Sequence, residues 1–192
     1  MKAILNNKYV FWAILTLPLI WLLIDNRVFG AKGGEFFYWT GALSGIFVLL
    51  TLCVTPLTRL YRTAPWRNWL IKRRRYLGVA AFGYLFVHTA YWLTIADFKR
   101  ILRSFTEPDL IIAWVSLVVF TLLALTSNDF SIRKLGKGWK KLQNWVFLGA
   151  TLGFIHWFWA VGWDKKTIAF YGGLFVLLLG VRLVWRRRSV RG

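Results

Sequence analysis

Acidic residues are scarce in this chain of 192 residues. Seven Asp and Glu stand against 26 Lys and Arg, which gives a formal net charge of +19 at pH 7. In a soluble protein such an excess of positive charge would indicate a nucleic-acid partner. Here the basic residues lie between long apolar runs, where they set the topology of membrane helices. We therefore expect membrane lipid around the chain and no nucleic-acid partner.

Metal-binding side chains are also few, because the chain has one cysteine, one methionine and two histidines. Cys53 alone cannot form an intrachain disulfide, and a metal cluster would need more thiolates. Two histidines are too few for a closed zinc site, which needs four ligands. Residues 134–138, KLGKG, lack the Walker spacing of a phosphate-binding loop. His88 and His156 are therefore the only strong neutral pair of ligands in the apolar segments.

Apolar residues are abundant, at 58% of the chain, and 19% of the residues are aromatic. A soluble domain of this size could not bury so much apolar surface, whereas lipid covers it in a membrane protein. Six apolar segments each approach the roughly 20 residues that cross a bilayer as a helix. They are residues 9–24, 36–57, 76–95, 110–126, 142–161 and 167–185. We predict an all-α integral membrane six-helix bundle in a single domain, 1–192.

The charges also predict how these segments are oriented. If the N-terminus lies inside, 19 of the 26 basic residues fall in inner segments and six of the seven acids fall outside. The positive-inside rule then places the N- and C-termini in the cytoplasm. No A-x-A-like cleavage site follows the first segment, so we expect it to be retained as a span.

Each histidine lies deep in an apolar segment that begins with positive charge. His88 is 13 residues past Arg75, and His156 is 15 residues past Lys141. At 1.5 Å per residue these depths are roughly 20 and 22 Å from the cytoplasmic edge. Both helices run outward, so the two imidazoles are expected to be nearly level, in the outer half of the bilayer.

A histidine at that depth has two interpretations. It is either a core residue bonded to a neighbouring carbonyl or hydroxyl group, or part of a functional site. Two level imidazoles favour the second, because they are a common axial pair for haem iron and helical bundles house such cofactors. Gly153, one turn before His156, leaves room either for a flat macrocycle or for close helix packing.

Several short motifs resemble the MsrQ (YedZ) family. They are TPL (55–57) with Arg59, RRRYLG (73–78) and AFGY (81–84) before His88, LTS (125–127), KLGK (134–137) with Trp139, LQNWVFL (142–148) and IHW (155–157). They match the second, third and fifth spans of the family and the connections between spans, and together they cover about residues 41–186.

The resemblance implies a ferric-reductase-like bundle that acts as a haem b subunit of the bacterial inner membrane. Such subunits pass electrons from quinol to a periplasmic molybdenum-containing partner, MsrP, which reduces methionine sulfoxide in oxidised proteins. The chain would then be an electron-transfer subunit of an oxidoreductase complex with no catalytic residue of its own. Bound FMN is implied by the resemblance alone, since no motif in the sequence locates it.

Two rival functions stay open at this point. A membrane ferric or metal reductase would also hold haem and would add a metal-chelate site on the outer face. A small non-redox transporter or structural membrane protein would hold two core histidines and no haem.

The sequence departs from the family pattern at one position. A histidine that the family often has 13 residues before the fifth-span ligand is Gln143 here, and oxidase relatives have a histidine where Arg74 stands. An amide and a guanidinium are poor iron ligands, so one haem is expected, with His88 and His156 as its axial ligands. Arg74 and Gln143 are candidate contacts for haem propionates, quinone or flavin phosphate. Alternatively, they snorkel and hydrogen-bond at the interface.

Overall fold

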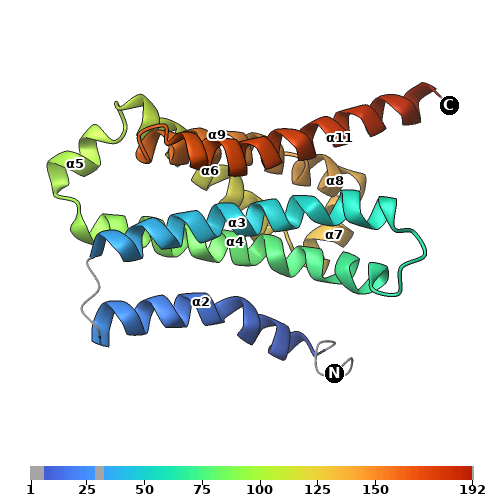
Figure 1. The fold of residues 1–192 in the computed structure, drawn as a ribbon, viewed down its shortest axis with the longest axis horizontal. Coiled ribbons are helices and arrows are strands. Elements are labelled where there is room, and N and C mark those ends of the chain that lie inside the picture. Colours follow the sequence, from blue (N-terminus) through green and yellow to red (C-terminus); the bar gives the residue numbers. More distant parts are fainter. Residues whose placement is uncertain (1–6, 29–32, 192) are drawn as a thin grey trace.

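The computed structural model describes residues 7–28 and 33–191 (Figure 1). In chain order its elements are α2 (Lys8–Val28), α3 (Gly33–Leu60), α4 (Arg67–Ile95), α5 (Phe98–Arg103), α6 (Pro108–Leu125), α7 (Asp129–Leu135), α8 (Lys137–Gln143), α9 (Val146–Ala160), α10 (Lys165–Thr167), the π-helical η1 (Ile168–Gly172) and α11 (Gly173–Arg191). The methionine, Met1, and two of the basic residues counted above, Lys2 and Lys32, lie outside the described residues.

In the described part of the chain, five stretches of helix are long and apolar enough to cross a membrane: α2, α3, α4, α6 and the run from α10 to α11. Helix α9 has 15 residues, which span about 22 Å and fall short of a core about 30 Å thick. It packs along α6 inside the bundle (Figure 1). The chain is therefore an all-helical membrane protein with five to six apolar spans, which confirms the predicted fold class.

Helices α4 and α9 begin furthest from the residues that the hydropathy pattern predicts. Helix α4 begins at Arg67 rather than at residue 76, because Arg and Lys are good helix formers and extend the helix beyond its apolar part. The fifth segment does not begin at residue 142, since α8 ends at Gln143 and α9 begins at Val146. Asn144 occupies the break, where a residue that disfavours helix interiors is tolerated.

Small residues bring α3 and α4 close together along their length. Ala42 and Ala81 are almost completely buried between them. The Ser44 hydroxyl donates a hydrogen bond of 3.0 Å to the Ala81 carbonyl. In lipid the hydrophobic effect does not favour helix association, because the lipid tails are themselves apolar. Helices therefore associate mainly through close packing at small side chains and through interhelical hydrogen bonds. The pair therefore forms a rigid wall of the bundle.

Helices α6 and α9 form a second close pair by the same means. The Ser116 hydroxyl donates to the Gly149 carbonyl at 2.9 Å. A Cβ atom on Gly149 would lie 3.0 Å from the Val119 side chain, so a larger residue here would push Val119 away by a few tenths of an ångström. The pair faces α3 and α4 across the bundle, and α4 contacts α6 while α3 contacts α9.

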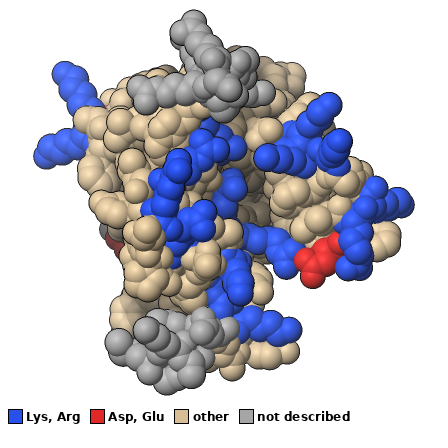
Figure 2. All heavy atoms as spheres, turned by 90° about the vertical axis from the view of Figure 1, so that its right-hand side faces the viewer, with Lys and Arg blue, Asp and Glu red and all other residues tan. Residues whose placement is uncertain are grey.

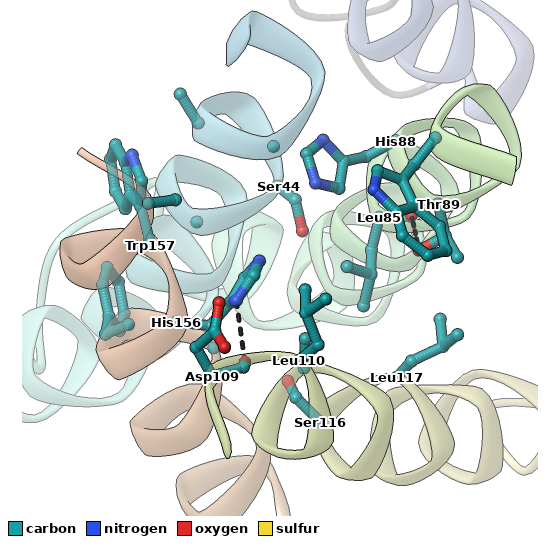
Figure 3. A pocket seen from close by; sticks show the side chains of 18 of the residues that line it. Ser44, Leu85, His88, Thr89, Asp109, Leu110, Ser116, Leu117, His156 and Trp157 are labelled. Carbon is teal, nitrogen blue, oxygen red and sulfur yellow. Dashed lines mark hydrogen bonds between the residues drawn. The ribbon is translucent and has the colours of Figure 1, made fainter. Parts of the chain in front are cut away.

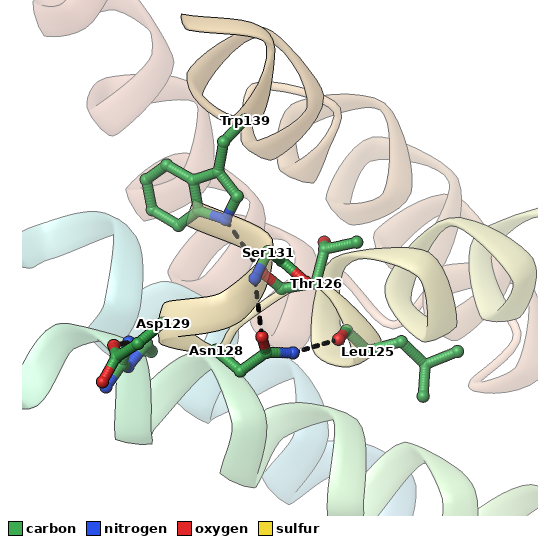
Figure 4. Close-up of polar contacts among 7 residues, drawn as sticks. Leu125, Thr126, Asn128, Asp129, Ser131 and Trp139 are labelled. Carbon is green, nitrogen blue, oxygen red and sulfur yellow. Dashed lines mark hydrogen bonds and ion pairs between the residues drawn. The ribbon is translucent and has the colours of Figure 1, made fainter. Parts of the chain in front are cut away.

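The connection between α6 and α9 folds back on the end of α6 (Figure 4). Asn128 accepts a hydrogen bond from the Ser131 N–H and caps α7, and the Trp139 indole donates to the Thr126 carbonyl at 2.8 Å. Asp129 pairs with Arg75 of α4. This hydrogen bond, together with the positive charge of Arg75, lowers the pKa of the Asp129 carboxyl group. The connection is thereby fixed to two of the spans.

Lys and Arg side chains gather at the end of the bundle where the α3–α4 connection, α7 and α8 lie (Figure 2). Asp129 is the one acid in the inner segments of the sequence, and its carboxylate is paired with Arg75. One end of the helices is thus strongly basic. Helices α4 and α9 both begin at this end, so they run parallel, as the sequence predicts.

Candidate functional site

The four helices α3, α4, α6 and α9 enclose a cavity of about 530 Å³. Its walls are mostly apolar, with Ser44, Thr89 and Ser116 as polar side chains along its length. Cofactor and ligand sites commonly have volumes of about 300–1,000 Å³ and this kind of lining. The cavity therefore has the size and character of a site for an organic cofactor inside the bundle.

His88 of α4 lines this cavity and is held against α3. Its Nδ1 lies 2.9 Å from the Phe37 carbonyl oxygen, and its ring stacks on the Phe37 ring with centroids 4.1 Å apart. A carbonyl oxygen can only accept, so Nδ1 carries the proton and donates this bond. In the neutral ring Nε2 then keeps its lone pair and is free to bind a metal.

His156 of α9 lines the same cavity and is held in the same way from α6. Its Nδ1 lies 3.0 Å from the carbonyl oxygen of Asp109, in the first turn of α6. The Nδ1–H again donates to a carbonyl, which leaves Nε2 as the unprotonated nitrogen. Figure 3 shows the two rings on opposite sides of the cavity with their Nε2 edges facing the space between them.

Gly41 leaves the space on α3 that the His88 ring occupies. A Cβ atom at this position would lie 2.9 Å from both Cε1 and Nδ1 of His88, closer than real Cβ contacts occur. Thr40 lies beside this position and is 0% exposed. Its hydroxyl group donates to the carbonyls of Phe36 and Phe37, which keeps its side chain in place. The ring is thus seated in a notch of α3 with little freedom to turn.

The residues of the cavity fit a haem group. Two imidazoles with Nδ1 bound to carbonyls have the arrangement that metal-binding histidines usually show. Trp157 lines the cavity, and its Nε1–H is buried with no acceptor among the described residues. This nitrogen is also closed off from the cavity space, so the fit to haem depends on the two imidazoles and the apolar walls.

Neither Arg74 nor Gln143 lines the cavity. Gln143 ends α8, and its side-chain amide donates to the Leu123 carbonyl and the Thr126 hydroxyl, both at 3.2 Å. Arg74 is half-buried in the basic part of α4. Their predicted contacts with haem propionates, quinone or flavin phosphate stay predictions, and Gln143 has a structural role in joining α8 to α6.

Replacing Gln143 with Ala is therefore expected to leave haem content and the absorption spectrum unchanged. The variant loses two hydrogen bonds at the basic end of the bundle, so we expect a lower melting temperature. Haem per chain and thermal unfolding of the purified variant measure the two effects separately. A variant that folds but loses its haem would make Gln143 part of the cofactor site.

Three charged residues at one end of the cavity were not foreseen from the sequence. Arg100 of α5, Glu107 and Asp109 all line it. The apolar segment was expected to begin at residue 110 with no carboxylate inside it, whereas α6 begins at Pro108 and carries Asp109 in its first turn. The charged stretch at 97–109 was visible in the sequence, but its approach to the cavity depends on how α5 folds back.

The fold and the cavity define an integral membrane helical bundle with an internal cavity that two histidines line. Residues 10–154 match the family described as ferric reductase like transmembrane component, and the chain belongs to that family. The family binds haem generally, and the chain is a transmembrane electron-transfer component of this type. The match contains His88 and ends two residues before His156. No solved structure matches the chain significantly.

Proposed function

We propose that the chain holds one haem b with His88 and His156 as its axial ligands and passes electrons through the membrane. The observation that carries the proposal is the matched pair of imidazoles on one cavity, each with Nδ1 bound to a backbone carbonyl. The haem, when bound, supplies one-electron chemistry. The chain supplies the ligands, an apolar sleeve and the hydrogen bonds that set the reduction potential.

The backbone hydrogen bonds have a direct consequence for the two ligands. A carbonyl that accepts from Nδ1–H fixes the ring orientation and makes Nε2 a stronger donor to the metal. The Phe37 ring stacked on His88 and the buried Thr40 beside it restrict that ring further. Electron transfer is fast when the ligand atoms move little between the oxidised and reduced states. A His88 ring that is held in place on α3 would keep this movement small.

For the partners, we infer an MsrQ-type subunit that takes electrons from quinol and delivers them to a periplasmic MsrP-like molybdoprotein. The motifs of the second, third and fifth spans support this inference. The charged end of the cavity, at Arg100 and Asp109, lies near the helix ends opposite the basic face and suits delivery there. FMN binding stays a prediction from the resemblance, without an assigned residue.

A reconstituted assay tests the proposed function against its rival. The purified protein in lipid vesicles should be reduced by a quinol and reoxidised by the molybdoprotein with methionine sulfoxide present. The rival function, a membrane ferric or metal reductase, is favoured by the position of Glu107 and Asp109 at the mouth of the cavity. Carboxylates are suitable ligands for ferric iron. Reoxidation by a ferric chelate alone, with no transfer to the molybdoprotein, would identify a metal reductase.

The orientation in the bacterial inner membrane is proposed from the basic end of the bundle, which would face the cytoplasm with both termini (Figure 2). Reporter fusions after Gly192 are expected to be active only with a cytoplasmic reporter. A periplasmic reporter fused to the connection between α5 and α6, near Phe105, should be active instead. Activity of a periplasmic reporter at Gly192 would contradict the orientation.

A further inference from the structure

The cavity has one positively charged side chain in its lining. Most of its described lining is apolar or aromatic, and the charged residues Arg100, Glu107 and Asp109 are gathered at one end. Arg100 is the one cation among the described residues that line it. Among the described lining residues, Arg100 is therefore the side chain with which a negatively charged substituent of a bound group could pair.

Helix α5 is fixed over this end of the cavity by its own contacts. Asp97 caps the helix by accepting from the Arg100 N–H at 2.6 Å. Ser104, which is 0% exposed, accepts from the Trp114 indole at 3.0 Å, and the Phe105 ring stacks on Trp114 with centroids 5.4 Å apart. Trp114 itself lines the cavity. The backbone that carries Arg100 is thus tied to the cavity wall.

The Arg100 guanidinium makes no ion pair or side-chain hydrogen bond with another described residue. Glu107 and Asp109 line the same end, yet neither lies within ion-pair distance of it. Guanidinium groups bind carboxylates through two parallel hydrogen bonds, so an unpaired one at a cavity mouth is suited to a carboxylate ligand. Without Arg100 the mouth would carry two negative charges and repel such a ligand.

We propose that Arg100 binds the propionate carboxylates of the haem and so fixes which edge of the macrocycle faces the α5 end. The proposal rests on the proposed haem function. It assigns to Arg100 the propionate contact that the sequence suggested for Arg74 and Gln143. Arg100 is a cofactor-binding residue in this account, and its neighbour Lys99, which does not line the cavity, is a matched control.

The test compares iron protoporphyrin IX with its dimethyl ester, in which both propionates are blocked. Each is loaded into the full-length apoprotein in detergent, and its loss to an excess of a haem-binding acceptor protein is timed. Wild type should lose the ester about tenfold faster than haem, since one charge-assisted contact is removed. Arg100→Ala should lose haem about tenfold faster than wild type and should no longer retain haem longer than the ester.

The controls separate this contact from other effects of the substitution. Lys99→Ala should behave as wild type with both compounds, and Arg100→Lys should retain part of the preference for haem because it keeps the charge. Equal loss of haem and ester from wild type would overturn the role of Arg100 while leaving the haem site in place. An Arg100→Ala variant that still prefers haem, or loses both compounds faster by the same factor, would also overturn it. Failure of wild type to bind either compound would instead contradict the proposed function.

Discussion

Replacing His88 or His156 with Ala is expected to remove the low-spin haem spectrum and stop electron transfer. In the proposed site each imidazole is one of two axial ligands, and the chain has no other histidine. Cys53 lies on α3 and does not line the cavity, so it is not a ready substitute. The iron should become five-coordinate or absent, which the absorption spectrum and the haem content of each purified variant report.

Adding free imidazole to the His88→Ala and His156→Ala variants is the control for this prediction. The Ala variants keep a space the size of the missing ring, and free imidazole should occupy it and restore the low-spin spectrum. The bundle should still fold, because Phe37 and Asp109 lie in helices whose own hydrogen bonds do not need the histidine. A normal spectrum in His88→Ala without added imidazole would show that the ligand assignment is wrong.

Replacing Gly41 with Ala is expected to be nearly as damaging, although the residue makes no contact with the iron in this account. The new Cβ would lie 2.9 Å from two atoms of the His88 ring, so the ring must leave its notch and lose its bond to the Phe37 carbonyl. Loss of a hydrogen-bonded partner behind a metal ligand typically lowers affinity about 10- to 100-fold. We expect haem loss to accelerate by a similar factor and the reduction potential to shift.

Gly83→Ala is the matched control for this variant. Gly83 lies in the middle of α4, and a Cβ there would meet no atom within 4 Å. The substitution should stabilise the helix slightly, by up to about 1 kcal/mol, and leave the spectrum and potential unchanged. Gly41→Ala and Gly83→Ala with the same haem loss rate and the same potential would show that the notch does not hold the ligand.

The membrane class and the common cavity of the two histidines could be predicted from the sequence, because both depend on spacing. The positive charges mark the basic end of each span, and the rise per residue then gives an approximate depth for His88 and His156, although a break at Asn144 interrupts the helix before His156. The helix ends were predicted less well. The start of α4 at residues 67–75 was missed, because hydropathy detects the apolar part of a helix and not its charged extension.

The partners of the histidines could not be predicted in this way. The carbonyls of Phe37 and Asp109 belong to helices that are distant in sequence, and they reach the rings only through the packing of α3 on α4 and of α6 on α9. The approach of Arg100 to the cavity likewise depends on the turn that brings α5 over it. Spacing along one helix contains no information on contacts of this kind.

One haem per chain with two histidine ligands can be tested by a haem count together with a reduced-minus-oxidised spectrum of the purified protein. We predict one haem b per chain by pyridine haemochrome assay and the sharp bands of low-spin iron with two imidazole ligands. The absence of a Soret band, or two haems per chain, would contradict the account.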